Sequence, residues 1–188
     1  MMTAVVGGFQ VSRGTGYRTF WASGYRAEVI EMQIVGVRVE LPSNTPIVLL
    51  REVGGANRML PIFIGGPEAT AIALALDEVS TPRPMTHDLM RNLLDALDAM
   101  MVRLDVTALE NGTFYAEMHV EHGGQITQIT CRPSDGIALA LRADAPVFVA
   151  ESVIDEAGYI VDDETESEDV VEQFREFIDQ VNPEDFES

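Results

Sequence analysis

A short pattern of polar residues occurs twice in this sequence, 49 positions apart. Residues 83–88 have the sequence RPMTHD, and residues 132–135 have the sequence RPSD. Each segment places Arg-Pro just before a predicted helix, a hydroxyl residue at the expected N-cap and an aspartate in the first turn. Guanidinium groups bind phosphate bidentately, and carboxylates can hold a divalent cation. If the two helix starts converge, the sequence predicts one polar site there.

The candidate site takes further residues from the same helix starts. Glu68 adds a carboxylate in the first turn of a third predicted helix, and His87 is the acid–base candidate. The candidates are His87, Asp88, Asp135 and Glu68 for catalysis, Arg83, Arg132, Ser134 and Thr86 for substrate binding, and Asp88, Asp135 and Glu68 as ligands of Mg²⁺ or Mn²⁺.

The same residues also have a purely structural interpretation. A carboxylate in a first helical turn is stabilised by the helix dipole whatever its function, and Thr86 and Ser134 are typical N-caps. The two arginines could simply pair with those carboxylates. Capping alone does not require Arg-Pro before both helices, however, so the duplication favours a shared site.

The charge of the chain restricts its partners. The net charge is −19, and every cation is an arginine because the chain has no lysine. Residues 151–188 carry fifteen acids against Arg175, whereas residues 32–150 carry fourteen acids against eight arginines. A polyanion is repelled by such a molecule, because nonspecific affinity comes from phosphate neutralisation by cations. Binding of nucleic acid would need a local arginine cluster or a bridging cation.

The sequence also indicates a compartment. Cys131 is the only cysteine, so no intrachain disulfide can form. No apolar run approaches the roughly 20 residues that span a bilayer, and the N-terminus has no signal-peptide pattern. These features predict a cytoplasmic protein that makes no membrane contact.

The hydrophobic patterns predict the elements that position the site. Strands are expected over 32–41, 46–53, 58–64, 102–109, 113–121, 125–131 and 147–150, and helices over 67–79, 87–100 and 134–142. Hairpins with helices between them are typical of an α+β domain. We expect a largely antiparallel or mixed sheet packed with three to four helices, plus a C-terminal amphipathic helix.

The predicted helices have different apolar faces. The sequence IALAL occurs at 72–76 and again at 137–141, and both helices are predicted to lie buried against the sheet or in a subunit interface. Helix 87–100 has an apolar stripe for packing, formed by Leu89, Leu93, Leu94, Leu97 and Met100 or Met101. His119, on the polar face of a strand, and His122, in a turn, are expected to be solvated.

Four segments follow from these patterns. Residues 1–31 form a poorly patterned extension, explained either by an upstream start codon used in place of Met32 or by an arm that packs on a partner. Residues 32–158 form the domain, 159–168 an acidic linker, and 169–188 an amphipathic helix with an acidic tail.

Five motifs in a fixed order resemble a known family. They are LPIFIG at 60–65, EATAIALAL at 68–76, RPMTHDL at 83–89, GTFYA at 112–116 and RPSDGIALA at 132–140. In this order they resemble the bifunctional nuclease domain family of bacteria and plants, over residues 32–158. The closing NPEDF at 182–186 is similar to the tails of actinobacterial members. The resemblance implies an α+β fold, self-association, and DNA and RNA as substrates.

Hydrolysis of a phosphodiester needs charge neutralisation, a positioned water and protonation of the leaving oxygen. Carboxylates with Mg²⁺ or Mn²⁺ would supply the first two, arginines would clamp the phosphate, and His87 would move the proton. The alternative is a non-catalytic oligomeric scaffold or a small-ligand-binding regulatory protein. Its arginine pair would bind a nucleotide or carboxylate, and its acidic tail helix would recruit a partner.

Overall fold

The computed structural model describes residues 17–19 and 28–160. Most of the extension 1–31, nearly all of the acidic linker and the whole predicted helix of 169–188 lie outside the described residues. Within them, no helix combines the length and the apolar character needed to cross a bilayer.

One mixed sheet runs through the described part of the chain. Its strands are β1 (Tyr17–Thr19), β2 (Glu28–Glu40), β3 (Thr45–Glu52), β4 (Arg58–Phe63), β5 (Ala99–Glu110), β6 (Thr113–His122), β7 (Gln125–Cys131), β8 (Val147–Ala150) and β9 (Tyr159–Ile160). The spatial order is β7-β6-β5-β8-β2-β3-β4-β9, with β1 paired to β2. Among these described strands, β5 and β8 are parallel and the other pairs are antiparallel.

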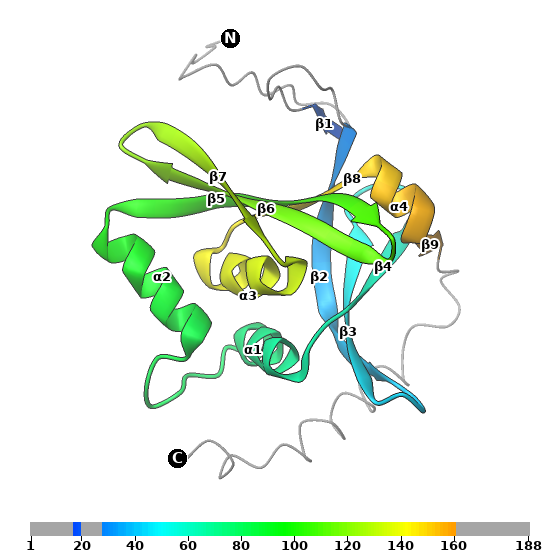
Figure 1. Cartoon of the computed structure of the whole chain (residues 1–188), viewed down its shortest axis with the longest axis horizontal. Helices are drawn as coiled ribbons and strands as arrows, with labels where there is room; N and C mark the ends of the chain where they lie inside the picture. Colours follow the sequence, from blue (N-terminus) through cyan, green and yellow to red (C-terminus); the bar gives the residue numbers. More distant parts are fainter. Residues whose placement is uncertain (1–16, 20–27, 161–188) are drawn as a thin grey trace.

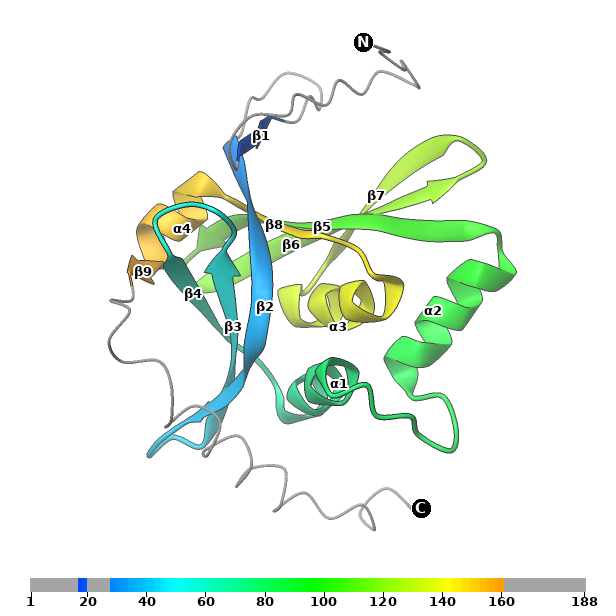
Figure 2. The same cartoon turned by 180° about the vertical axis from the view of Figure 1, so that it is seen from behind.

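Four helices accompany the sheet, which confirms the predicted α+β class. They are α1 (Gly66–Leu76), α2 (Thr86–Ala96), α3 (Pro133–Ala143) and α4 (Glu151–Ala157). Figure 1 shows α1, α2 and α3 in the angle between the β2–β4 half of the sheet and the β5–β7 half. Figure 2, the view from behind, places α4 beside β4 and β9, away from the other three helices.

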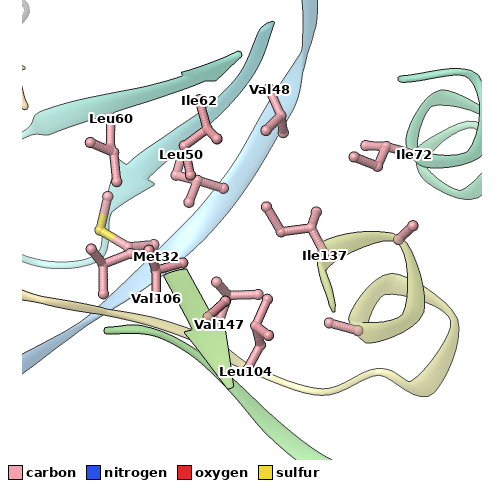
Figure 3. Close-up of a cluster of buried hydrophobic side chains, with 14 of the residues drawn as sticks. Met32, Val48, Leu50, Leu60, Ile62, Ile72, Leu104, Val106, Ile137 and Val147 are labelled. Carbon is pink, nitrogen blue, oxygen red and sulfur yellow. The ribbon is translucent and has the colours of Figure 1, made fainter. Parts of the chain in front are cut away.

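The core lies where the two halves of the sheet meet α1 and α3. The second IALAL segment is buried as predicted, apart from Leu141, and Ile137 is 0% exposed. In the first segment only Ile72 and Ala73 are buried, whereas residues 74–76 are partly exposed. In Figure 3, Ile137 points from α3 into the cluster of apolar side chains contributed by the sheet. Helix α3 comes very close to β5, because a Cβ at Gly136 would lie 2.4 Å from Leu104 Cδ1. This close packing fixes the first turn of α3 relative to the sheet.

The structure corrects several predicted elements. Helices α1 and α2 end at Leu76 and Ala96, earlier than expected, and the nearby Glu78 and Asp98 have positive φ angles of 54° and 53°. The short elements β1, α4 and β9 were not predicted, since a few residues give no recognisable periodicity.

The apolar stripe predicted for α2 divides between the core and the solvent. Leu89, Leu93 and Leu97 are more than half exposed, whereas Met90 and Leu94 pack partly against the core. The helical periodicity was correct, but it does not say which side of the helix meets the protein.

Candidate functional site

The first turns of three helices meet around one arginine. Arg132, the N-cap residue of α3, donates from Nε to Asp135 Oδ2 at 2.7 Å and from Nη2 to Asp135 Oδ1 at 3.1 Å. Its Nη2 also donates to Glu68 Oε1, in the first turn of α1, at 2.6 Å. In the first turn of α2, His87 Nε2 lies 3.4 Å from Asp135 Oδ1. We call Glu68, His87, Arg132 and Asp135 the helix-start cluster.

Exposure to solvent differs sharply within the helix-start cluster. The side chain of Arg132 is 66% exposed, that of Asp135 is 27% exposed, and those of Glu68 and His87 are 14% and 9% exposed. Hydrogen bonds to Asp135 and then Glu68 raise the pKa of Arg132 above its ordinary value. The cluster therefore presents a permanent cation to solvent, held by two carboxylates beside a nearly buried imidazole.

Asp88 lies outside this cluster and contacts a residue that the sequence analysis missed. It accepts a hydrogen bond from Arg142 Nε and another, at 2.8 Å, from the Met85 backbone N–H. Burial raises the pKa of Asp88, but the Arg142 and Met85 hydrogen bonds outweigh this and lower the pKa below its ordinary value. Arg142 also donates to the carbonyl oxygens of Ala71 and Ala138.

Arg142 thus ties together α1, α2 and α3, the helices that carry the helix-start cluster. Its side chain is only 11% exposed. The one sequence signal that could have found it is an arginine directly after the second IALAL segment, since a cation at the end of so apolar a helix needs an internal partner.

The remaining candidates are placed differently from the prediction. The N-cap of α2 is Met85, not Thr86, because Thr86 is already the first residue of that helix. The N-cap of α3 is Arg132, not Ser134, because Pro133 is the first residue of that helix. Ser134 is buried and Thr86 is exposed. Arg83 is exposed, and within the described residues it makes no side-chain hydrogen bond or ion pair with the cluster. The two Arg-Pro motifs are therefore not equivalent in space.

The three carboxylates predicted as metal ligands do not converge. Arg132 binds Glu68 and Asp135, while Arg142 binds Asp88. Across residues 28–160, no group of three or more His, Cys, Asp or Glu side chains is placed to hold a metal ion. The donor set as arranged does not fit Mg²⁺ or Mn²⁺, because guanidinium groups hold the oxygens that the cation would need.

The predicted solvation of His119 is wrong. Its side chain is 2% exposed, and its Nε2 lies 2.9 Å from Asp105 Oδ2. His119 on β6 is directly opposite Arg103 on β5, and Arg103 also pairs with Asp105, so these three side chains form a largely buried polar cluster between the two strands.

Cys131 precedes Arg132, and its surroundings disfavour the thiolate. Burial, followed by the negative charge of Asp135, raises the pKa of this thiol to about 11. The thiolate is the reactive form, so the side chain stays unreactive near neutral pH.

Comparison with known proteins assigns the chain to a family. A model of the bifunctional nuclease domain matches residues 48–162, which contain the whole helix-start cluster. The chain belongs to the bifunctional nuclease domain family. This confirms the resemblance carried by the five sequence motifs.

Relatives of this bifunctional nuclease domain protein occur in bacteria and plants. An uncharacterized protein of Mycobacterium tuberculosis is 44% identical over 165 residues, covering 84% of this chain and 98% of that protein. Bifunctional nuclease 1 of Oryza sativa is 22% identical over 127 residues, covering 66% of this chain and 38% of the rice protein. Bifunctional nuclease 2 of Arabidopsis thaliana is 24% identical over 114 residues, covering 58% of this chain and 35% of the Arabidopsis protein. The chain spans less than two fifths of these plant proteins.

Proposed function

We propose that this protein is a nuclease that hydrolyses phosphodiester bonds in DNA and RNA at the helix-start cluster. The observation that carries the proposal is the Arg132 guanidinium, two-thirds exposed and fixed by Glu68 and Asp135 beside His87. The names of the plant relatives support the same reaction class.

In the proposed reaction, Arg132 binds the phosphate and His87 moves the proton. Asp135 holds Arg132 through Nε and Nη2, which leaves the Nη1 end of the guanidinium for a phosphate oxygen. Asp135 also accepts from His87 Nε2, so Nδ1 of the imidazole is the proton acceptor. Water attacks phosphorus and gives its proton to His87, which then protonates the departing oxygen as the P–O bond breaks.

A single mechanism for both substrates must use water as the nucleophile. DNA has no 2′-hydroxyl, so attack by the neighbouring hydroxyl is available only in RNA. The described carboxylates do not fit a divalent cation as arranged, and the reaction is therefore written without a metal step. A divalent cation could bind Glu68 and Asp135 only if it displaced Arg132 from them. Loss of cleavage on addition of EDTA would show that the reaction needs such a cation.

The test compares two Arg–Asp pairs of the same chain. Arg132→Gln and Asp135→Asn alter the cluster, whereas Arg91→Gln and Asp95→Asn alter a second, surface pair on α2. We expect the purified protein to cleave plasmid DNA and RNA, the first two variants to lose about 100-fold or more in rate, and the second two to stay near wild type. Each variant is checked for folding by circular dichroism, and each reaction is repeated with EDTA.

Cleavage that survives Arg132→Gln and Asp135→Asn would contradict the proposal. It would indicate a contaminating nuclease and favour the non-catalytic scaffold.

We further propose that the protein acts in the cytoplasm, since its single cysteine excludes an intrachain disulfide. We also propose that it is a homo-oligomer, since α2 leaves an apolar face uncovered.

A further inference from the structure

Helix α2 turns most of its polar side chains toward the protein, together with Met90 and Leu94, and its other leucines toward solvent. His87 contacts Asp135, Asp88 binds Arg142, and Arg91 Nη1 donates to the carbonyl oxygen of Arg142 at 2.8 Å. In this helix the only buried residue is His87. An amphipathic helix on a monomer normally has the reverse arrangement.

The outward side of α2 carries a continuous leucine stripe. Leu89, Leu93 and the C-cap residue Leu97 are 61%, 58% and 56% exposed. Residues four apart lie on the same helical face, so these three side chains form one row. Soluble monomers rarely leave such contiguous apolar surface uncovered, and exposed rows of this kind mark interaction sites.

We infer that the leucine stripe is the dimer interface, covered by α2 of a second copy packed antiparallel. The stripe is symmetric about Leu93, so a two-fold axis there brings Leu89 of one copy against Leu97 of the other. This inference names the surface for the self-association proposed above, and it holds whether or not the protein cleaves nucleic acid.

The charges around the stripe select a second copy as the occupant. The whole chain has a net charge of −19, which opposes the approach of two copies at most surfaces. Among the exposed residues of α2, the single charged one is Asp95, and Arg91 neutralises it at 2.9 Å. Asn92 and Ala96, which are exposed beside the stripe, are uncharged, and Asp98 is an exposed carboxylate one residue beyond Leu97. Within residues 89–96, two acidic copies can therefore meet without opposing unpaired carboxylates.

The dimer would also brace the helix that begins with His87. A partner packed along Leu89–Leu97 restrains α2 from the outside, while Arg142 and Asp135 restrain it from the inside. The imidazole of each helix-start cluster would then be positioned partly by the other copy.

Cysteine cross-linking of the full chain tests the antiparallel arrangement. In a Cys131→Ala background, we expect Leu93→Cys to give disulfide-linked dimers by itself under oxidised glutathione. Leu89→Cys and Leu97→Cys should cross-link efficiently when mixed and poorly when each is alone, because opposite ends of the helices face each other. Efficient cross-linking of Leu89→Cys to itself, or equal yields in all combinations, would contradict the inference.

Sedimentation of the uncrosslinked protein tests the surface independently of orientation. Wild type should sediment as a dimer, and Leu93→Glu should weaken dimerisation at least about 100-fold by placing two carboxylates at the two-fold axis. Leu41→Glu is the matched control, since Leu41 is 78% exposed at a turn far from α2 in sequence, and this variant should stay dimeric. A monomeric wild type, or a Leu93→Glu variant that associates as wild type does, would overturn the proposal and leave the stripe to another segment or protein.

Discussion

Arg58 and Arg132 each bind more than one carboxylate, but their surroundings differ. Arg58 binds Glu52, whose side chain is 2% exposed, and also reaches Asp155 at 3.2 Å. Glu52 further accepts the backbone N–H of Ala56, closing the turn between β3 and β4. Arg132 binds two carboxylates, Glu68 and Asp135, while its own side chain is two-thirds exposed. The buried Arg58–Glu52 pair therefore stabilises the fold, whereas the exposed guanidinium of Arg132 is accessible to a ligand.

The two arginines should respond differently to the same substitution. Arg58→Gln leaves the buried Glu52 carboxylate without its charge partner, so we expect the free energy of unfolding to fall by about 3 kcal/mol. Arg132→Gln should lower it by less, because Glu68 and Asp135 keep 14% and 27% of their side-chain exposure and the glutamine amide can still donate to one of them. Urea denaturation followed by circular dichroism measures both, and equal destabilisation would contradict this division of roles.

Glu52 also predicts how stability depends on pH. The hydrogen bond from Arg58 lowers the pKa of Glu52 despite its burial. A lowered folded-state pKa contributes stability above the ordinary carboxyl value of about 4.3, and this contribution disappears as pH falls through the lower folded value. We expect acid to destabilise wild type more steeply than Glu52→Gln below about pH 4.3. If the free energies of unfolding of the two proteins change in parallel between pH 5 and pH 3, Glu52 does not contribute to the acid sensitivity of the fold.

The secondary-structure elements could be predicted from local sequence patterns, but the way in which the helices pack against one another could not. Alternation located β5 to β7, and Asn111–Gly112 forms the predicted turn with φ angles of 51° and 78°. The convergence of Glu68, His87 and Asp135 depends on how α1, α2 and α3 pack together, which no local pattern encodes. Arg142 was missed for the same reason, since its partners lie on other helices.

Close packing between α3 and β5 gives a prediction for Gly136. A methyl group there would meet Leu104 Cδ1 at 2.4 Å and Cys131 Sγ at 3.2 Å, and Leu104 is fully buried. We expect Gly136→Ala to lower the free energy of unfolding by about 1–3 kcal/mol, because the core must shift to admit it. Gly66→Ala, with nothing within 4 Å of the new Cβ, is the control for thermal denaturation. Equal melting temperatures for both variants would contradict the packing argument.

Buried Arg142 should matter more to the helices than the surface arginine Arg91. Arg142→Gln removes the Asp88 pair and weakens two backbone hydrogen bonds, so a loss of about 3 kcal/mol in unfolding free energy is expected. Arg91→Gln should lose less, about 1 kcal/mol, because its pair with Asp95 is half exposed and it makes one hydrogen bond to the Arg142 carbonyl oxygen instead of two backbone bonds and a buried ion pair. Urea denaturation compares them, and a smaller loss for Arg142→Gln would show that the three helices hold together without it.

For the whole molecule, charge sets the conditions under which nucleic acid can bind. Residues 161–188 contain twelve acids and one arginine, whereas the other 160 residues contain nineteen acids and eleven arginines, so the short segment carries more than half of the net charge. Removing these residues should strengthen binding to a DNA oligonucleotide several-fold at low salt, and raised ionic strength should shrink the difference. Fluorescence anisotropy at two salt concentrations measures it. If the full chain and the shortened variant bind the oligonucleotide with equal affinity at low salt, residues 161–188 do not control the binding of nucleic acid.

The most direct measurement of the proposed chemistry compares two histidines in DNA cleavage. His87 is nearly buried against Asp135, whereas His122 is exposed at the end of β6. We expect His87→Gln to reduce the single-turnover cleavage rate by about 100-fold or more, and His122→Gln to leave it near wild type, with both variants folded. Cleavage by folded His87→Gln at the wild-type rate would contradict a nuclease site at the helix-start cluster.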